Sequence, residues 1–208
     1  MEKSIRRFES YSPRFIFNKM TLREIINLNP TLNAGDDSVG TDKDTTHNYI
    51  NGFYEEHFAK YQNNKINLLE IGVNSGGSLF LWSKFFNNGN IYGIELHDRI
   101  KPYFKGLHNV RYIFSDAYND NIISHLPQFD IIIDDGPHTL ESQIYCISNY
   151  ITKLNNGGIM VIEDVQSFDH IDILKYYTPK DSNINSYHID LRASKNRYDD
   201  LLFIIEKK

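Results

Sequence analysis

The stretch Leu69-Glu70-Ile71-Gly72-Val73-Asn74-Ser75-Gly76-Gly77-Ser78 decides how the rest of this sequence is interpreted. It lies between a short apolar run and an apolar, helix-like stretch, which predicts a strand, a tight turn and a helix. Glycines lack a Cβ atom, so the backbone here can turn sharply and approach a ligand closely. The glycine spacing departs from the G-x-G-x-x-G fingerprint of dinucleotide sites. The turn therefore favours a ligand without a pyrophosphate.

Short apolar runs alternate with helix-like stretches from Asn67 onward, which is typical of βαβ units and a parallel sheet. The runs are apolar on both faces, as strands covered by helices on each side must be. Strands are predicted at residues 67–72, 90–96, 110–115, 129–134 and 158–163, and helices at 78–86, 118–125 and 139–154. Two more strands, at 186–191 and 201–206, are predicted around the charged stretch 192–200.

The segment before the sheet predicts helices at 21–28 and 46–61, separated by a polar loop at 33–44. The chain has 208 residues and shows no repeat or low-complexity linker, which suits one domain of roughly 100–200 residues. We therefore predict a single domain, with an N-terminal helical cap over residues 1–62 and a core for binding and catalysis over 63–208.

Composition excludes several classes of protein. No apolar run approaches the roughly 20 residues that cross a bilayer, and residues 1–17 carry charges and aromatics where a signal peptide needs apolar residues. We therefore expect a cytoplasmic protein without a membrane partner. The net charge of -5 and the scattered basic residues argue against a nucleic-acid partner. The single cysteine, Cys146, is predicted to be buried on a helix.

Acidic residues follow the next two predicted strands. In an open α/β sheet, ligands bind beyond the carboxyl ends of the strands. Glu95 ends the second strand, about 20 residues after the glycine turn, where such folds bind ribose hydroxyls. Asp116 follows the third strand, where a carboxylate can accept a hydrogen bond from an adenine amino group. A nucleoside-binding site is therefore predicted from the glycine turn together with Glu95 and Asp116.

This pattern, from about residue 68 to 163, resembles class I methyltransferases that use S-adenosylmethionine. The resemblance implies a Rossmann-like α/β fold with seven mostly parallel strands, helices on both faces and one antiparallel strand in the final pair. It also implies that Glu70 lies near the methionine amino group and that the backbone around Gly72 faces the cofactor. The candidate cofactor-binding residues are Glu70, Gly72, Asn74, Ser75, Gly76, Ser78, Glu95, Asp116 and Asp134.

A second acidic cluster follows the fourth and fifth strands, as Asp134-Asp135-Gly136-Pro137-His138 and Glu163-Asp164. These strand ends should meet at one edge of the sheet, where several carboxylates repel one another unless a cation is present. Mg²⁺ or another hard divalent ion would resolve the repulsion. Alternatively, the aspartates cap the next helix and the other acids are solvated.

The second cluster is similar to that of metal-dependent sugar O-methyltransferases of macrolide biosynthesis, of the mycinamicin type. More generally it resembles catechol O-methyltransferase. The stretch Gly40-Thr41-Asp42-Lys43, with His47 and Tyr49, extends the resemblance upstream. It implies Asp135, Glu163 and Asp164 as metal ligands, with His138 as general base beside Asp135. Pro137 replaces a usual serine, and which of Asp134 and Asp135 points at the ion stays open.

The resemblance predicts a Mg²⁺-assisted O-methyltransferase for a sugar hydroxyl, on a nucleotide-activated sugar or a glycosylated product. His47 and Tyr49 are candidates to contact the acceptor, or else to pack against the sheet. A catechol or phenol methyltransferase, a noncatalytic S-adenosylmethionine-binding module and a nicotinamide oxidoreductase are the alternatives. The missing dinucleotide fingerprint argues against the last of these. Proteins of this resemblance are often homo-oligomers, but the sequence fixes no oligomeric state.

Overall fold

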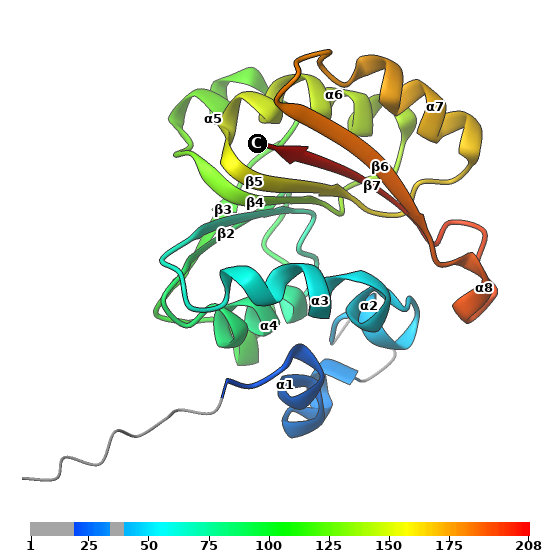
Figure 1. The fold of residues 1–208 in the computed structure, drawn as a ribbon. Coiled ribbons are helices and arrows are strands. Elements are labelled where there is room, and N and C mark those ends of the chain that lie inside the picture. Colours follow the sequence, from blue (N-terminus) through cyan, green and yellow to red (C-terminus); the bar gives the residue numbers. More distant parts are fainter. Residues whose placement is uncertain (1–18, 34–39) are drawn as a thin grey trace, which may run out of the picture.

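A seven-stranded sheet forms the middle layer of the computed structural model, which describes residues 19–33 and 40–208 (Figure 1). The strand order is β3-β2-β1-β4-β5-β7-β6. Strand β7 runs antiparallel to both its neighbours, and the other neighbouring pairs are parallel. The strands are β1 (Asn67–Ile71), β2 (Asn90–Glu95), β3 (Val110–Phe114), β4 (Phe129–Asp134), β5 (Leu154–Ile162), β6 (Ile184–Asp190) and β7 (Leu201–Lys207). The predicted α/β sheet, with its antiparallel strand in the final pair, is confirmed.

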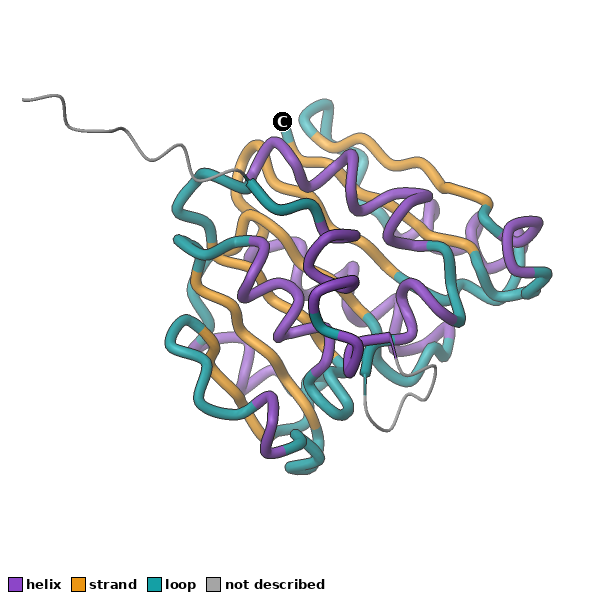
Figure 2. The backbone as a smooth tube through the Cα atoms, turned by 90° about the horizontal axis from the view of Figure 1, so that it is seen from below, coloured by secondary structure: helices purple, strands orange, loops and turns teal. Residues whose placement is uncertain are grey.

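Helices cover both faces of the sheet. On one face lie α1 (Leu22–Leu28), α2 (Asp42–Thr45), α3 (Glu55–Phe58) and α4 (Gly77–Phe85), seen in front of the strands in Figure 2. On the other face lie α5 (Asp120–His125), α6 (Leu140–Tyr150) and α7 (Phe168–Tyr177), and α8 (Arg192–Lys195) joins β6 to β7. Among the described residues, no helix is long and apolar enough to cross a membrane.

The sheet is buried on both faces because successive strand residues enter different cores. Leu68 belongs to the core beneath α1 and α4, whereas Leu69 belongs to the core beneath α6 and α7. This alternation explains why the strands are apolar throughout. Cys146, in α6, is fully buried in the second core, as predicted.

The first described helices belong to the same core as the sheet. Leu22 and Ile25 of α1 pack in one cluster with Trp82 of α4 and with strand residues such as Leu68. Of the predicted cap over residues 1–62, residues 1–18 and 34–39 lie outside the described residues. The part that is described forms, with α4, the helical layer on one face of the sheet (Figure 1).

Several helical segments differ from the prediction, among them α2 at the end of the predicted loop 33–44 and α8 within the charged stretch 192–200. Residues 46–61 do not form one regular helix, because a π-helical turn at Ile50–Tyr54 precedes α3 and a 3-10 turn at Ala59–Tyr61 follows it. Gly52 in the π-helical turn lies so close to Leu191 that a Cβ there would meet its side chain. Helix α7 was not predicted, although Ser167 caps it by accepting a hydrogen bond from the backbone of His170.

Candidate functional site

A cavity of about 560 Å³ opens at the carboxyl ends of β1 to β4, within the range usual for small-molecule sites. This is the edge where open α/β sheets bind their ligands. The residues that line it are Gly40, Thr41, Asp42, Ile71, Gly72, Val73, Asn74, Ser78, Ile94, Glu95, Leu96, Arg99, Ser115, Asp116, Ala117, Tyr118, Asp135, Gly136, Pro137 and His138. The cavity therefore joins the glycine turn to the segment after β4.

The glycine turn packs directly on that segment. Gly72 has a φ of 79°, and its amide donates to the Ile94 carbonyl at 2.9 Å. A Cβ at Gly72 would overlap the backbone carbonyl of Asp135. Gly76, with a φ of 92°, begins α4 in the left-handed conformation that favours glycine. The glycine turn thus approaches the backbone of Asp135 closely, and this contact with the protein itself already requires a glycine at position 72.

The two acids predicted for the nucleoside both line the cavity. The Glu95 carboxylate accepts hydrogen bonds from the backbone amides of Asn74, at 2.9 Å, and Leu96, at 3.0 Å. Asp116 is exposed, and its Oδ1 accepts from the Tyr118 amide at 2.9 Å. Gly72, Asn74 and Ser78 line the same cavity. The structure therefore brings these predicted cofactor residues together.

Glu70, which the resemblance places near the methionine amino group, does not line the cavity. It is fully buried and accepts hydrogen bonds from Ser78 Oγ at 2.7 Å and Trp82 Nε1 at 3.1 Å. Burial raises the pKa of its carboxyl to about 7. Ser75 and Gly76 also lie outside the lining, and Ser75 Oγ donates to the Gly40 carbonyl at 3.2 Å. Glu70, Ser75 and Gly76 therefore contact the rest of the protein and not the cavity.

Asp134 and Asp135 point to different places. Asp134 is 2% exposed, accepts from the Tyr118 hydroxyl at 2.8 Å and does not line the cavity. Burial raises its pKa to about 7. Asp135 lines the cavity, so it is the aspartate that faces the site. The cofactor contact predicted for Asp134 would therefore have to pass through Tyr118.

Asp135 and His138, which line the cavity, converge with Asp164, which is buried and does not line it. One ligand atom from each lies within 4.8 Å of the others, a spacing that could hold a metal ion. His138 Nε2 lies 3.6 Å from Asp164 Oδ2 and 4.0 Å from Asp135 Oδ1. His138 and Asp164 have φ angles of 57° and 53°. Such left-handed backbone is uncommon for residues other than glycine and is often found at functional sites.

Glu163, the third metal ligand implied by the resemblance, contacts a lysine that sequence reasoning did not single out. Its carboxylate is 1% exposed and accepts hydrogen bonds from the Tyr54 hydroxyl and from Lys43 Nζ. Lys43 Nζ also donates to Asp135 Oδ2 at 2.8 Å and lies 3.3 Å from Glu70 Oε1. Burial lowers the pKa of Lys43, but the surrounding carboxylates outweigh burial and hold it well above its usual value.

His47 and Tyr49 are buried, at 3% and 1% exposure, and neither lines the cavity. Their rings stack with centroids 4.7 Å apart. Tyr49 donates its hydroxyl to Asp164, and His47 Nδ1 lies 2.6 Å from Asp200 Oδ1. Of the two predicted roles, packing fits this burial, whereas direct contact with an acceptor does not. The pair positions Asp164.

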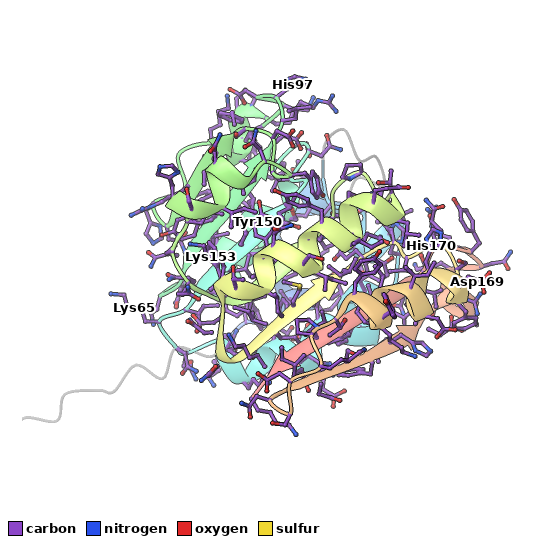
Figure 3. The ribbon with its side chains drawn as sticks, turned by 90° about the horizontal axis from the view of Figure 1, so that it is seen from above. Lys65, His97, Tyr150, Lys153, Asp169 and His170 are labelled. Carbon is purple, nitrogen blue, oxygen red and sulfur yellow. The ribbon has the colours of Figure 1, made fainter. Side chains whose placement is uncertain are left out.

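Other histidines form no comparable group among the described residues. Two clusters among the described residues have metal-ligand spacing, and the only histidines in them are His47 and His138. His97 and His170 lie well apart at different edges of the molecule (Figure 3). The described histidines outside the two clusters therefore contribute no second candidate metal site.

Comparisons with known proteins agree with this fold. Residues 69–165 match a family model described as a methyltransferase domain. The 8-demethyl-8-alpha-L-rhamnosyl tetracenomycin-C 2'-O-methyltransferase of Streptomyces olivaceus is 33% identical over 136 residues, covering 62% of this chain and 36% of that protein. Mycinamicin VI 2''-O-methyltransferase of Micromonospora griseorubida is 33% identical over 120 residues, covering 54% and 30%.

A solved structure shares the fold as well. MycE, a methyltransferase from the mycinamycin biosynthetic pathway in complex with Mg, SAH and mycinamycin VI, aligns with a TM-score of 0.59 at 26% identity. The alignment covers 76% of this chain and 49% of that one. The strand order and the family match over residues 69–165 give this chain a Rossmann-like fold similar to that of methyltransferase domains. The chain resembles the sugar O-methyltransferases of macrolide and tetracenomycin biosynthesis, and it spans about a third of the length of these curated relatives.

Proposed function

We propose that this chain transfers the methyl group of S-adenosylmethionine to a sugar hydroxyl, with the assistance of Mg²⁺ or another divalent ion. The observation that carries the proposal is a single cavity in which Gly72 and Glu95 face Asp135 and His138. A methyl donor and an acceptor hydroxyl would there be bound side by side. Such positioning supplies a large part of the rate enhancement of two-substrate enzymes.

The nucleoside half of the cavity suits S-adenosylmethionine. Glu95 would accept hydrogen bonds from ribose hydroxyls, because its carboxylate has lone pairs beyond those used by two backbone amides. Asp116 would accept from the adenine amino group. The backbone at Gly72 and Asn74 would approach the methionine portion. S-adenosylmethionine, when bound, supplies an electrophilic methyl group on a sulfonium centre.

The acidic half of the cavity suits a hard divalent ion. Asp135 and Asp164 offer the oxygen donors that Mg²⁺ prefers, and their ligand atoms lie within 4.8 Å of one another. Glu163 would complete the set, since it shares the ammonium of Lys43 with Asp135. When bound there, the ion would lower the pKa of an acceptor hydroxyl and orient a neighbouring hydroxyl beside it.

His138 would act as the general base. It lines the cavity, and its side chain is 35% exposed, so an acceptor in the cavity could reach it. Asp164 and Asp135, at 3.6 and 4.0 Å, would stabilise the positive charge that the ring gains when it takes the hydroxyl proton. The acceptor oxygen would then bond to the methyl carbon as the carbon–sulfur bond breaks.

The acceptor class comes from the relatives, whose names describe methylation of sugars on tetracenomycin and mycinamicin. For this chain we propose a sugar hydroxyl on a nucleotide-activated sugar or on a glycosylated product. The net charge of -5 makes a nucleic-acid acceptor unfavourable. We also propose that the chain forms a homo-oligomer, and the resemblance is the only support for this.

Methyl transfer from radiolabelled S-adenosylmethionine to a panel of sugars and catechols, with and without EDTA, tests the proposal. We expect transfer to a sugar that is lost in EDTA and restored by Mg²⁺. His138→Ala should abolish transfer, whereas His108→Ala, at an exposed histidine outside the cavity, should not. Undiminished activity in EDTA would contradict the metal role, and preference for a catechol would contradict the sugar. Binding of S-adenosylhomocysteine without transfer to any acceptor would indicate a noncatalytic module.

A further inference from the structure

Lys43 is the one buried lysine among residues 19–33 and 40–208, and its side chain is completely inaccessible. Lysines are almost never fully buried unless they are paired with acids. The ammonium of Lys43 contacts carboxylates that follow or lie in three neighbouring strands: Glu70 in β1, Asp135 after β4 and Glu163 after β5. A protein cation therefore already lies among the acids that the proposed function assigns to a metal ion.

The backbone around Lys43 is fixed at this position. Thr41 caps α2 by accepting a hydrogen bond from the Lys43 amide, and Ser75 Oγ donates to the Gly40 carbonyl. The contact between Gly40 and Gly77 is so close that a Cβ at Gly77 would overlap the Gly40 carbonyl. The segment that carries Lys43 is thus held against the glycine turn.

The contacts of Lys43 fall on two of the three implied metal ligands. Asp135 Oδ2 accepts from the ammonium at 2.8 Å, and Glu163 accepts from it through Oε2 while Tyr54 donates to Oε1. Asp164 has no such contact with Lys43, because its partners are Tyr49, His47 and His138. A positive charge at hydrogen-bonding distance reduces the attraction of a carboxylate for a second cation.

We propose that Lys43 competes with the divalent ion for Asp135 and Glu163 and thereby sets the metal affinity of the site. The proposal rests on the proposed function, because it takes these acids as the metal site. Without the ion, Lys43 satisfies carboxylates that would otherwise repel one another. With the ion, Lys43 gives up part of its contact with them, so the ion binds more weakly than the acids alone would allow.

Replacing Lys43 tests this competition, because competition and a purely structural role predict opposite changes in metal affinity. Lys43→Met keeps the length of the side chain and removes its charge, and Lys43→Gln removes the charge but keeps a hydrogen-bond donor. Lys153→Met is a matched control with the same change of net charge. Lys153 follows α6 at its end away from the cavity, where its Nζ donates to the Leu126 carbonyl (Figure 3).

Mn²⁺ affinity would be measured by isothermal titration calorimetry, with thermal unfolding to verify that each variant is folded. We expect both Lys43 variants to bind Mn²⁺ about tenfold more tightly or better, and Lys153→Met to bind like the parent chain. Equal or weaker binding in a folded Lys43 variant overturns the proposal but leaves the proposed function standing. If neither the parent chain nor the variants bind Mn²⁺, both the proposal and the metal role are overturned.

A measurement on the unaltered chain covers the case in which neither Lys43 variant folds. A buried ammonium held by carboxylates should give a separate NMR signal, and competition predicts that this signal shifts during a Mg²⁺ titration. The shift should saturate at the same ion concentration as calorimetric binding. A signal that stays unchanged while Mg²⁺ binds overturns the proposal.

Discussion

Replacing Gly72 with alanine tests whether the glycine turn and the segment after β4 form one packed unit. Gly72 has a φ of 79°, and the left-handed conformation costs an ordinary residue about 1–2 kcal/mol. A Cβ there would also overlap the carbonyl oxygen of Asp135, which is backbone and cannot turn aside as a flexible side chain can. Overpacking adds about 1–3 kcal/mol. The expected loss in free energy of unfolding is therefore about 2–5 kcal/mol.

Gly157→Ala is the matched control, because Gly157 also has a φ of 79° but has no atom within 4 Å of the position of a Cβ. Its expected loss is the conformational part alone, about 1–2 kcal/mol. Urea unfolding would measure both losses, and calorimetry would measure S-adenosylhomocysteine binding, which should weaken only in Gly72→Ala. Equal losses with binding intact in both variants would refute the argument that the turn is wedged against Asp135.

Three further variants probe single contacts of the site. Asp134→Asn removes a carboxyl whose pKa is raised to about 7 by burial. The folded protein holds this proton more tightly than the unfolded chain does. As the pH rises from about 4 to about 7, the parent should therefore lose about 1.4 kcal/mol of stability per pH unit. The slope measured by urea unfolding should be smaller in the variant by this amount, because Glu70 still contributes its own, and an equal slope in both proteins would contradict the assignment. Tyr49→Phe removes the hydroxyl that donates to Asp164 and should weaken Mn²⁺ binding about tenfold in calorimetry, while unchanged binding would rule out a positioning role. Glu95→Gln should weaken S-adenosylhomocysteine binding about tenfold and leave Mn²⁺ binding unchanged, so a loss of both would contradict separate half-sites.

The sheet could be predicted because its signals are local. Apolar runs bounded by turn residues identify strands, and β4 begins and ends at the predicted residues, Phe129 and Asp134. The order of the strand ends then placed Glu95, Asp116 and Asp135 at one edge without any knowledge of side-chain contacts. Topology alone brings together residues that are far apart in the chain, because parallel strands end at the same edge.

The contacts of individual site residues could not be predicted in the same way. Lys43 lies 92 residues before Asp135 and 120 before Glu163, and no local pattern reports that they meet. The signal that could have found it was electrostatic. Converging carboxylates require a cation, and the Gly40-Thr41-Asp42-Lys43 stretch contains one. Glu70 illustrates the converse, since a strand's alternation turns its carboxylate away from the cavity and toward Ser78 and Trp82.

Backbone strain and charge coincide at this edge of the sheet, and the coincidence favours a functional role for the side chains. Four described residues other than glycine have a positive φ, and three of them, Asn74, His138 and Asp164, follow β1, β4 and β5. The fourth, Asn196, ends α8, where asparagine is a common left-handed cap. Glycine at the other three positions would relieve about 1–2 kcal/mol each. The strain kept at His138 and Asp164 supports the proposed roles of their side chains in proton removal and ion binding, which glycine could not perform.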